Sequence, residues 1–156
     1  MANEWPRPVI MRVFGIPVAQ GRGRAYTYRP KGAAPGTVRV GMYDPHTSRD
    51  WKRTVQAVAI DTRKQEGASW PLTGPVTISF SFFMPRPKSL PKKVRDHIKR
   101  PDWKNLVAGT EDALKGIVWL DDSQVVFAVV DKRYATQENP PGVTIRVGRS
   151  LDEAVK

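Results

Sequence analysis

An alternation of apolar and polar residues at positions 75–84 limits the fold of this chain more than any other feature. Within PVTISFSFFM a large apolar side chain takes every second place and a hydroxyl side chain stands between: Val76, Ile78, Phe80 and Phe82 alternate with Thr77, Ser79 and Ser81. Successive side chains of a strand point to opposite faces of a sheet, so this period of two predicts a strand with one buried face.

Two other segments show the period of an α-helix. The spacing predicts one helix over Thr47–Gln65 and a second over Asn105–Lys115, with Gly116 able to end the second. The apolar stripes are Trp51, Val55, Val58 and Thr62 in the first helix, and Leu106, Val107, Thr110, Ala113 and Leu114 in the second. The predicted strand at 75–84 therefore lies between two helices along the chain.

Three further strands are expected. The first covers residues 8–19, with an interruption near Gly15 and Pro17. The second covers residues 124–131, QVVFAVVD, and its continuous apolar run predicts burial on both faces. The third covers residues 142–149, where apolar residues alternate again.

The order of these elements, β, α, β, α, β, β, predicts the fold class. We expect an α+β fold with a mixed β-sheet of about four strands and two main helices. Residues 20–45 are rich in glycine, proline and arginine, so they predict a loop or a long flexible hairpin. A single domain is expected over residues 1–156, with loose ends at 1–7 and 150–156.

The charge of the chain indicates a polyanionic partner. It has 26 lysines and arginines against 15 aspartates and glutamates, which gives a formal net charge of +11 and favours nucleic acid. There is no cysteine, which excludes disulfides and thiolate metal sites. No apolar run approaches the roughly 18 residues of a membrane span, and the start lacks the apolar core of a secretory signal. A cytoplasmic protein without membrane contact is expected.

The basic residues gather in two segments, 20–40 and 86–100. In the first segment Tyr26 and Tyr28 interleave with arginines. Arginine binds phosphate and tyrosine can stack on unpaired bases, although an ordinary polar loop would look the same. The candidate DNA-binding residues are Arg22, Arg24, Lys88, Lys92, Lys93, Arg95, Lys99 and Arg100.

Carboxylates gather between residues 100 and 126, against the overall charge: Asp102, Glu111, Asp112, Asp121 and Asp122. Asp102 precedes the second helix and Asp121–Asp122 follow it, so a chain that turns back can bring both sites to one sheet edge. Mg²⁺ typically takes one or two carboxylates plus water and phosphate oxygens, and it can stabilise the leaving oxygen of a phosphodiester. Asp102, Asp121 and Asp122 are therefore candidate ligands of Mg²⁺ or Mn²⁺. Helix capping is the competing role for Asp102.

Several motifs resemble the RusA family of phage-type Holliday junction resolvases, in order and over roughly residues 12–148. They are GIPVAQGRGRAY, MYDPHTSRDWKRTV, MPRPKSLPKK and, most specific, PDWKNL followed by DAL and WLDDSQVV. The resemblance implies a RusA-like fold and a homodimeric, Mg²⁺-dependent endodeoxyribonuclease. Such an enzyme resolves four-way junctions and other branched DNA in recombination and repair, in a bacterial or phage-infected cell. The resemblance also implies catalytic roles for Asp102 and Asp122, with Asp121 adjacent.

Two positions depart from the family pattern P-D-x-D-N-L-x-K. Its second aspartate falls at Lys104 and its lysine falls at Ala108. Positions 104, 108 and 111 lie on one face of a helix, so Lys104 can take the place of the missing cation and Glu111 that of the missing carboxylate. An exposed surface pair is the alternative for Lys104 and Glu111.

Three functions are open at this point. A junction-resolving endonuclease explains the motifs and the ordered carboxylates. A catalytically impaired RusA-like protein that only binds DNA junctions explains Lys104 and Ala108. A basic RNA- or ribosome-associated protein explains the charge but not the acids.

Overall fold

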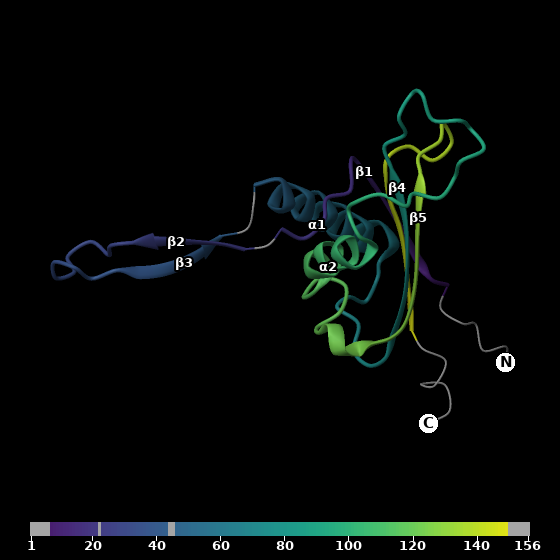
Figure 1. Ribbon diagram of the computed structural model, residues 1–156. Coiled ribbons are helices and arrows are strands. Elements are labelled where there is room, and N and C mark those ends of the chain that lie inside the picture. The colour runs from purple at the N-terminus through teal and green to yellow at the C-terminus, as the bar shows by residue number, and fades with distance from the viewer. Residues whose placement is uncertain (1–6, 22, 44–45, 150–156) are drawn as a thin grey trace.

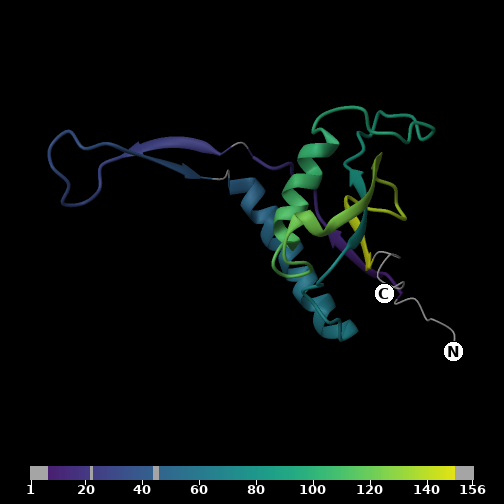
Figure 2. The same ribbon diagram turned by 90° about the horizontal axis from the view of Figure 1, so that it is seen from below.

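The computed structural model describes residues 7–21, 23–43 and 46–149. The elements follow in the order β1 (Val9–Phe14), β2 (Arg24–Tyr28), β3 (Arg39–Tyr43), α1 (His46–Glu66), β4 (Val76–Met84), α2 (Trp103–Leu114), the short 3-10 helix η1 (Asp122–Gln124), β5 (Val125–Tyr134) and β6 (Gly142–Arg149). Figure 1 and Figure 2 show α1 and α2 packed together on one side of the main sheet. The predicted α+β class, with a mixed sheet and two main helices, is confirmed.

The main sheet has four strands in the order β1-β6-β4-β5. β6 lies between β1 and β4 and pairs antiparallel with both, whereas β4 and β5 pair in parallel. Parallel neighbours need a crossover connection, and α2 lies in the connection between β4 and β5. The crossover therefore carries the chain along α2 from the C-terminal end of β4 back to the N-terminal end of β5.

The core lies between this sheet and the two helices. The predicted alternation in β4 is confirmed, since every second residue from Val76 to Met84 is buried. Phe80 and Phe82 are fully buried and their rings stack with centroids 5.9 Å apart. The helices join through a buried hydrogen bond of 3.4 Å, in which Trp51 Nε1 donates to Thr110 Oγ1.

Both predicted helices are confirmed, with ends that differ by one or two residues. α2 ends at Leu114, Lys115 is its C-cap residue, and Gly116 follows with a φ of +79°. Glycine adopts this left-handed conformation without strain, which explains why the helix stops there. Among the described residues no helix is both long and apolar enough to cross a membrane.

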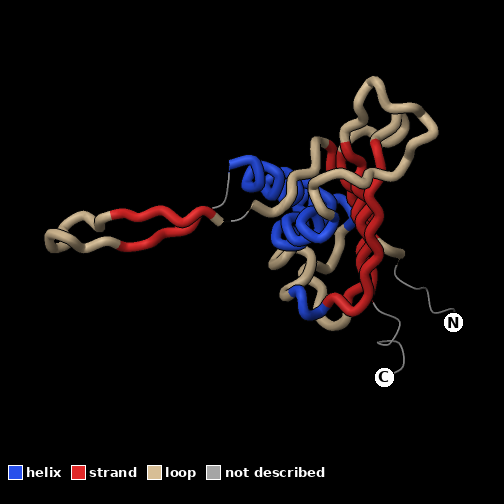
Figure 3. Tube along the Cα trace, in the orientation of Figure 1, coloured by secondary structure: helices blue, strands red, loops and turns tan. Residues whose placement is uncertain are grey.

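The predicted strand at residues 124–131 is present as β5, but the prediction that it is buried on both faces is wrong. β5 is an edge strand, and Val126, Phe127 and Val129 are each about half exposed or more. The helices cover only one face of the sheet (Figure 3), so the opposite side of β5 stays open. A short apolar run cannot by itself distinguish a central strand from an edge strand.

The segment predicted as a loop or long hairpin contains a hairpin. β2 and β3 pair antiparallel, from Arg24 with Tyr43 to Tyr28 with Arg39, and they form a separate two-stranded sheet. Figure 1 and Figure 2 show this hairpin extending away from the helices and the main sheet. The first predicted strand is shorter than expected, because β1 ends at Phe14.

Candidate active site

Asp102 stands at the start of α2. It is the N-cap residue, with extended backbone angles, but its side chain makes no capping hydrogen bond. The chain that leads to it is held by Lys132 of β5, whose Nζ donates to the carbonyl oxygens of Lys99 (2.8 Å) and Pro101 (2.7 Å). These hydrogen bonds place Asp102 beside the C-terminal half of β5. Asp102 is exposed, and its carboxylate does not cap the helix.

Asp122 lies beyond the other end of α2, on a turn that depends on Trp119. The indole of Trp119 is fully buried, and its Nε1 donates a 2.9 Å hydrogen bond to Asp122 Oδ1. The backbone of the turn is closed by a hydrogen bond of 2.6 Å from Gly116 N to Trp119 O. Burial of a large aromatic side chain thus fixes the position of a surface carboxylate.

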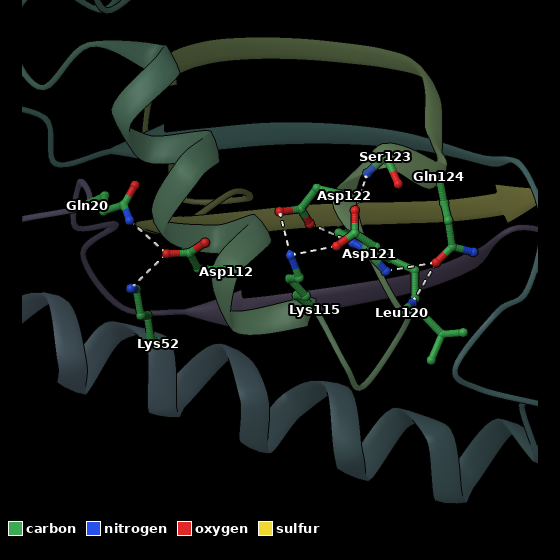
Figure 4. A network of polar contacts seen from close by, with 10 residues as sticks. Gln20, Lys52, Asp112, Lys115, Leu120, Asp121, Asp122, Ser123 and Gln124 are labelled. Carbon is green, nitrogen blue, oxygen red and sulfur yellow. Dashed lines mark hydrogen bonds and ion pairs between the residues drawn. The ribbon is translucent and has the colours of Figure 1, made fainter.

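Asp121 and Gln124 form a capping box around η1. Asp121 Oδ1 accepts from Ser123 N (3.0 Å), and Gln124 Oε1 accepts from the backbone nitrogens of Leu120 (2.7 Å) and Asp121 (2.9 Å). Gln124 Nε2 donates to the carbonyl oxygen of Leu72 at 2.9 Å, which ties the turn to the segment before β4. Figure 4 shows the contacts of Asp121 and Gln124 with Ser123 and Leu120. The glutamine of the DDSQVV motif is therefore a structural residue.

Lys115 contacts both aspartates, a feature that the sequence did not indicate. Its Nζ lies 2.9 Å from Asp121 Oδ2 and 3.9 Å from Asp122 Oδ2 (Figure 4). The hydrogen bond to Asp121 raises the pKa of Lys115, and the same hydrogen bond lowers the pKa of Asp121. No spacing rule connects a residue at the end of a helix with acids beyond the following turn, so only the fold could reveal this pair.

Glu111 lies in the last part of α2 and is half-buried. Burial raises its pKa, and the negative charges of Asp122 and then Asp112 raise it further. The carboxylate of Asp112 is itself paired, because its Oδ2 accepts from Gln20 Nε2 (2.7 Å) and from Lys52 Nζ (3.0 Å). Gln20 also donates its backbone N–H to Asn105 O at 2.8 Å.

We call Glu111, Asp121 and Asp122 the carboxylate cluster. Lys115 contacts Asp121 and Asp122, and the charge of Asp122 acts on Glu111, whereas Asp102 stands at the opposite end of α2. The helix has 12 residues and so rises about 18 Å. Within the described ranges no group of three or more aspartate, glutamate, histidine or cysteine side chains is placed to hold a metal ion.

Lys104 does not reach the carboxylate cluster. It lies in the first turn of α2, and its Nζ stands 5.8 Å from the centre of the Trp103 ring. Ala108 follows one turn later and is half-buried. Among the described residues it is therefore Lys115, and not Lys104, that contacts Asp121 and Asp122.

The basic segment between β4 and α2 is a loop, as expected, and it is held by Arg86. This side chain donates to the carbonyl oxygens of Ala135 (3.2 Å), Pro91 (3.2 Å) and Val94 (2.6 Å). It also helps to line a cavity of ≈ 460 Å³ that opens between the loop and the end of β5. The other basic side chains of the loop are exposed: Lys88, Lys92, Lys93, Arg95, Lys99 and Arg100.

Two candidate DNA contacts lie outside this loop. Arg24 is the first residue of β2. Arg22 lies outside the described residues.

Replacement of Glu111 by glutamine is expected to stabilise the protein at neutral pH. The folded-state pKa of Glu111 is raised, so the ionised carboxylate lowers the free energy of unfolding at every pH above that pKa. This penalty disappears as the pH falls toward the unfolded pKa. The gain from Glu111→Gln should therefore be present at about pH 7 and shrink toward about pH 4. Chemical denaturation of both proteins with EDTA present measures it.

Glu138→Gln is the matched control, because Glu138 is exposed on the loop after β5. It should change the free energy of unfolding little at either pH. A Glu111→Gln protein that is less stable than the wild type at about pH 7 would contradict the electrostatic assignment.

Comparison with known proteins shows the family of this chain. The family described as Endodeoxyribonuclease RusA matches residues 15–148. The chain is also 35% identical over 138 residues to a protein of Bacillus subtilis (strain 168) named Uncharacterized protein YqaN, a match that covers 80% of this chain and 87% of that protein. The chain belongs to the RusA endodeoxyribonuclease family.

Proposed function

We propose that the chain is a Mg²⁺-dependent, structure-selective endodeoxyribonuclease that resolves Holliday junctions and other branched DNA in recombination and repair. Membership of the RusA family implies an endodeoxyribonuclease of the junction-resolving type. Beyond membership, the carboxylate cluster carries the proposal. Its acids lie together on a chain with a net charge of +11, where they suit a phosphodiester and a divalent cation.

The carboxylate cluster fits Mg²⁺ in a limited way. Mg²⁺ usually takes only one or two protein carboxylates and completes its shell with water and substrate phosphate oxygens. Asp122 and Glu111 meet this requirement, and the raised pKa of Glu111 indicates negative charge that a cation would relieve. Bound there, the ion would stabilise negative charge on the oxygens of the cleaved phosphodiester. Mn²⁺ is the alternative ion.

Asp102 is proposed as a further catalytic carboxylate on the same DNA path. The side chain of Asp102 makes no capping hydrogen bond, and the exposed basic loop comes directly before this residue in the chain. The rise of about 18 Å along α2 corresponds to about five base pairs of duplex. A DNA arm that follows α2 would therefore pass both Asp102 and the carboxylate cluster.

A second function is favoured by Lys115. A cation already pairs with Asp121 at 2.9 Å, next to the place proposed for Mg²⁺. Lys104 and Ala108 stand where the family pattern has an aspartate and a lysine. On these grounds the alternative is a catalytically impaired protein that binds DNA junctions without cutting them.

Asp102→Asn and Asp122→Asn, made separately, are expected to abolish nicking of a labelled four-way junction. Asparagine caps a helix nearly as well as aspartate, and at position 122 it keeps an oxygen that can accept from Trp119 Nε1. The rate of nicking should fall roughly a hundredfold or more. Junction affinity should be equal or higher, because a negative charge facing phosphate is removed. Gel assays with Mg²⁺ or Mn²⁺ measure both quantities.

Asp61→Asn, on the exposed surface of α1, is the control and should nick at the wild-type rate. Wild-type nicking by the Asp102→Asn protein would remove Asp102 from the catalytic residues. A wild type that binds the junction but never nicks it would establish the second function. In that case, nicking restored by Lys104→Asp with Ala108→Lys would identify a resolvase that has lost its chemistry.

Charge reversal of the basic loop is expected to weaken junction binding and its dependence on salt. Each phosphate neutralised by lysine or arginine adds roughly 0.9 to the slope of log affinity against log salt. Lys92→Glu, Lys93→Glu and Arg95→Glu together should therefore lower both affinity and slope, and a salt titration of junction binding measures them. Lys64→Glu, on exposed α1, is the control. An unchanged slope in the triple variant would mean that the loop does not contact DNA.

A homodimer is proposed as the active assembly. A four-way junction has two equivalent strands to cut, and a two-fold dimer presents two equivalent sites to them. The contact proposed is the sheet face opposite the helices, which exposes the apolar side chains Ile10, Phe14, Phe127 and Val129. Apolar side chains are enriched at homodimer interfaces.

Sedimentation of the free protein is expected to give a species of twice 17.5 kDa. Phe127→Lys with Val129→Lys should shift it toward a single chain. Ile98→Lys should leave it dimeric, because Ile98 is 91% exposed and belongs to the basic loop, not to a strand of the sheet. A wild type that sediments only as a 17.5 kDa species would contradict the assembly.

A further inference from the structure

The β2–β3 hairpin has two faces of different chemistry. Side chains alternate across a ladder, and Tyr26 pairs with Gly41 while Tyr28 pairs with Arg39. These positions form one face, which we call the aromatic face. The other face carries Thr27, Val40 and Met42, which contain no ring and no charge.

The two tyrosines of the aromatic face lie close enough to act together. Their ring centroids are 5.8 Å apart, at 34° to each other, and the side chains are 47% (Tyr26) and 43% (Tyr28) exposed. Both rings therefore present a large surface to solvent on a hairpin that extends away from the rest of the molecule (Figure 1).

The absence of a side chain at Gly41 leaves the space that the Tyr26 ring occupies. A Cβ atom at position 41 would lie 2.6 Å from Tyr26 Cζ and 2.8 Å from its hydroxyl oxygen. The ring thus lies across the backbone of β3 in space that any other residue would fill. This packing against β3 covers part of the ring, and 47% of Tyr26 stays exposed.

The charge around these rings suits a polyanion. The sequence from Gln20 to Tyr43 contains no acidic residue, and its basic residues are Arg22, Arg24, Arg29, Lys31 and Arg39. Arg39 pairs with Tyr28 across the ladder, and Arg29 follows Tyr28 directly. Arg29 is oriented by its own hydrogen bond of 3.1 Å to Ala33 O. Guanidinium groups therefore flank the exposed rings.

Exposed rings flanked by arginines match the chemistry of unstacked nucleotides. Aromatic side chains stack on unpaired bases with little regard to sequence, while arginines contact the neighbouring phosphates. In a continuous duplex the bases are stacked on each other and have no free face. A branch point offers bases that can leave the stack.

We propose that the aromatic face of the β2–β3 hairpin binds unpaired bases at the branch point of a DNA junction, by stacking on Tyr26 and Tyr28. This inference rests on the proposed function and adds to it, because it makes the hairpin the part that recognises branching. The basic loop then supplies affinity for duplex arms of any sequence.

Binding to DNA measured in EDTA tests the role of the hairpin without any contribution from metal-dependent cleavage. The probes are oligothymidylate, a four-way junction with 2-aminopurine at its branch point, and a linear duplex. Tyr26→Ala with Tyr28→Ala should bind oligothymidylate about tenfold or more weakly, since stacking contributes roughly 1–3 kcal/mol per base. The salt slope should stay unchanged, because no charge is lost. The fluorescence change of 2-aminopurine on binding should be lost, and duplex binding should be retained.

Three matched variants test the geometry. Tyr26→Phe with Tyr28→Phe keeps both rings and should bind as the wild type does. Thr27→Ala with Val40→Ala, on the opposite face, should also bind normally. Gly41→Val keeps both tyrosines and all charges but displaces the Tyr26 ring, so it should weaken oligothymidylate binding. Hydrogen exchange of β2 and β3 amides confirms in each variant that the hairpin forms.

Wild-type binding of oligothymidylate by the double alanine variant, with its hairpin formed, would overturn the proposal. So would an equal loss in the Thr27→Ala, Val40→Ala protein. A wild type that prefers oligouridylate RNA to all three DNA probes would assign the hairpin to RNA instead. None of these readings needs cleavage, so a protein that never nicks would sink the nuclease proposal and leave the hairpin result standing.

Discussion

The hydrogen bond from buried Trp119 to Asp122 is the contact on which the candidate site depends. Burying a large apolar side chain contributes roughly 1.5–3 kcal/mol, far more than a surface ion pair. That energy holds the indole in the core, and the indole holds the carboxylate at 2.9 Å. Core stability and placement of Asp122 are therefore one property of the fold. Gln124 extends the same arrangement, since it fastens the turn to the carbonyl oxygen of Leu72.

Two of the acids between residues 100 and 126 each pair with a lysine of their own. Asp112 pairs with Lys52 and Asp121 pairs with Lys115. Burial raises the pKa of Glu111, and the negative charges of Asp122 and Asp112 raise it further. Glu111, which is half-buried and near Asp122, is therefore the acid of this region whose negative charge is disfavoured. The cation that we propose for this site would reduce the repulsion between Glu111 and its negatively charged neighbours.

The sequence was most informative where a pattern reports a local property. The alternation in 75–84 predicted β4 and its buried face, and the helical spacing predicted α1 and α2, because these patterns depend on which side of an element faces the core. It failed for β5, whose apolar run is the same for a central and an edge strand. It also suggested that Asp102 and Asp122 meet at one edge. A helix start and the start of the strand that returns beside it lie at opposite ends, so the fold separates them. The contact of Lys115 with Asp121 depends on the turn between them, which no periodicity describes.

The position of β6 has a consequence for how the protein is made. β6 is the last strand along the chain, yet it lies inside the sheet, between β1 and β4. While residues 142–149 are still within the ribosome, β1 has no partner strand and β4 lacks one of its two neighbours. Contacts between the start and the end of a chain form slowly, because a long loop must close first. The sheet that carries the candidate site is therefore completed only after synthesis has passed β6.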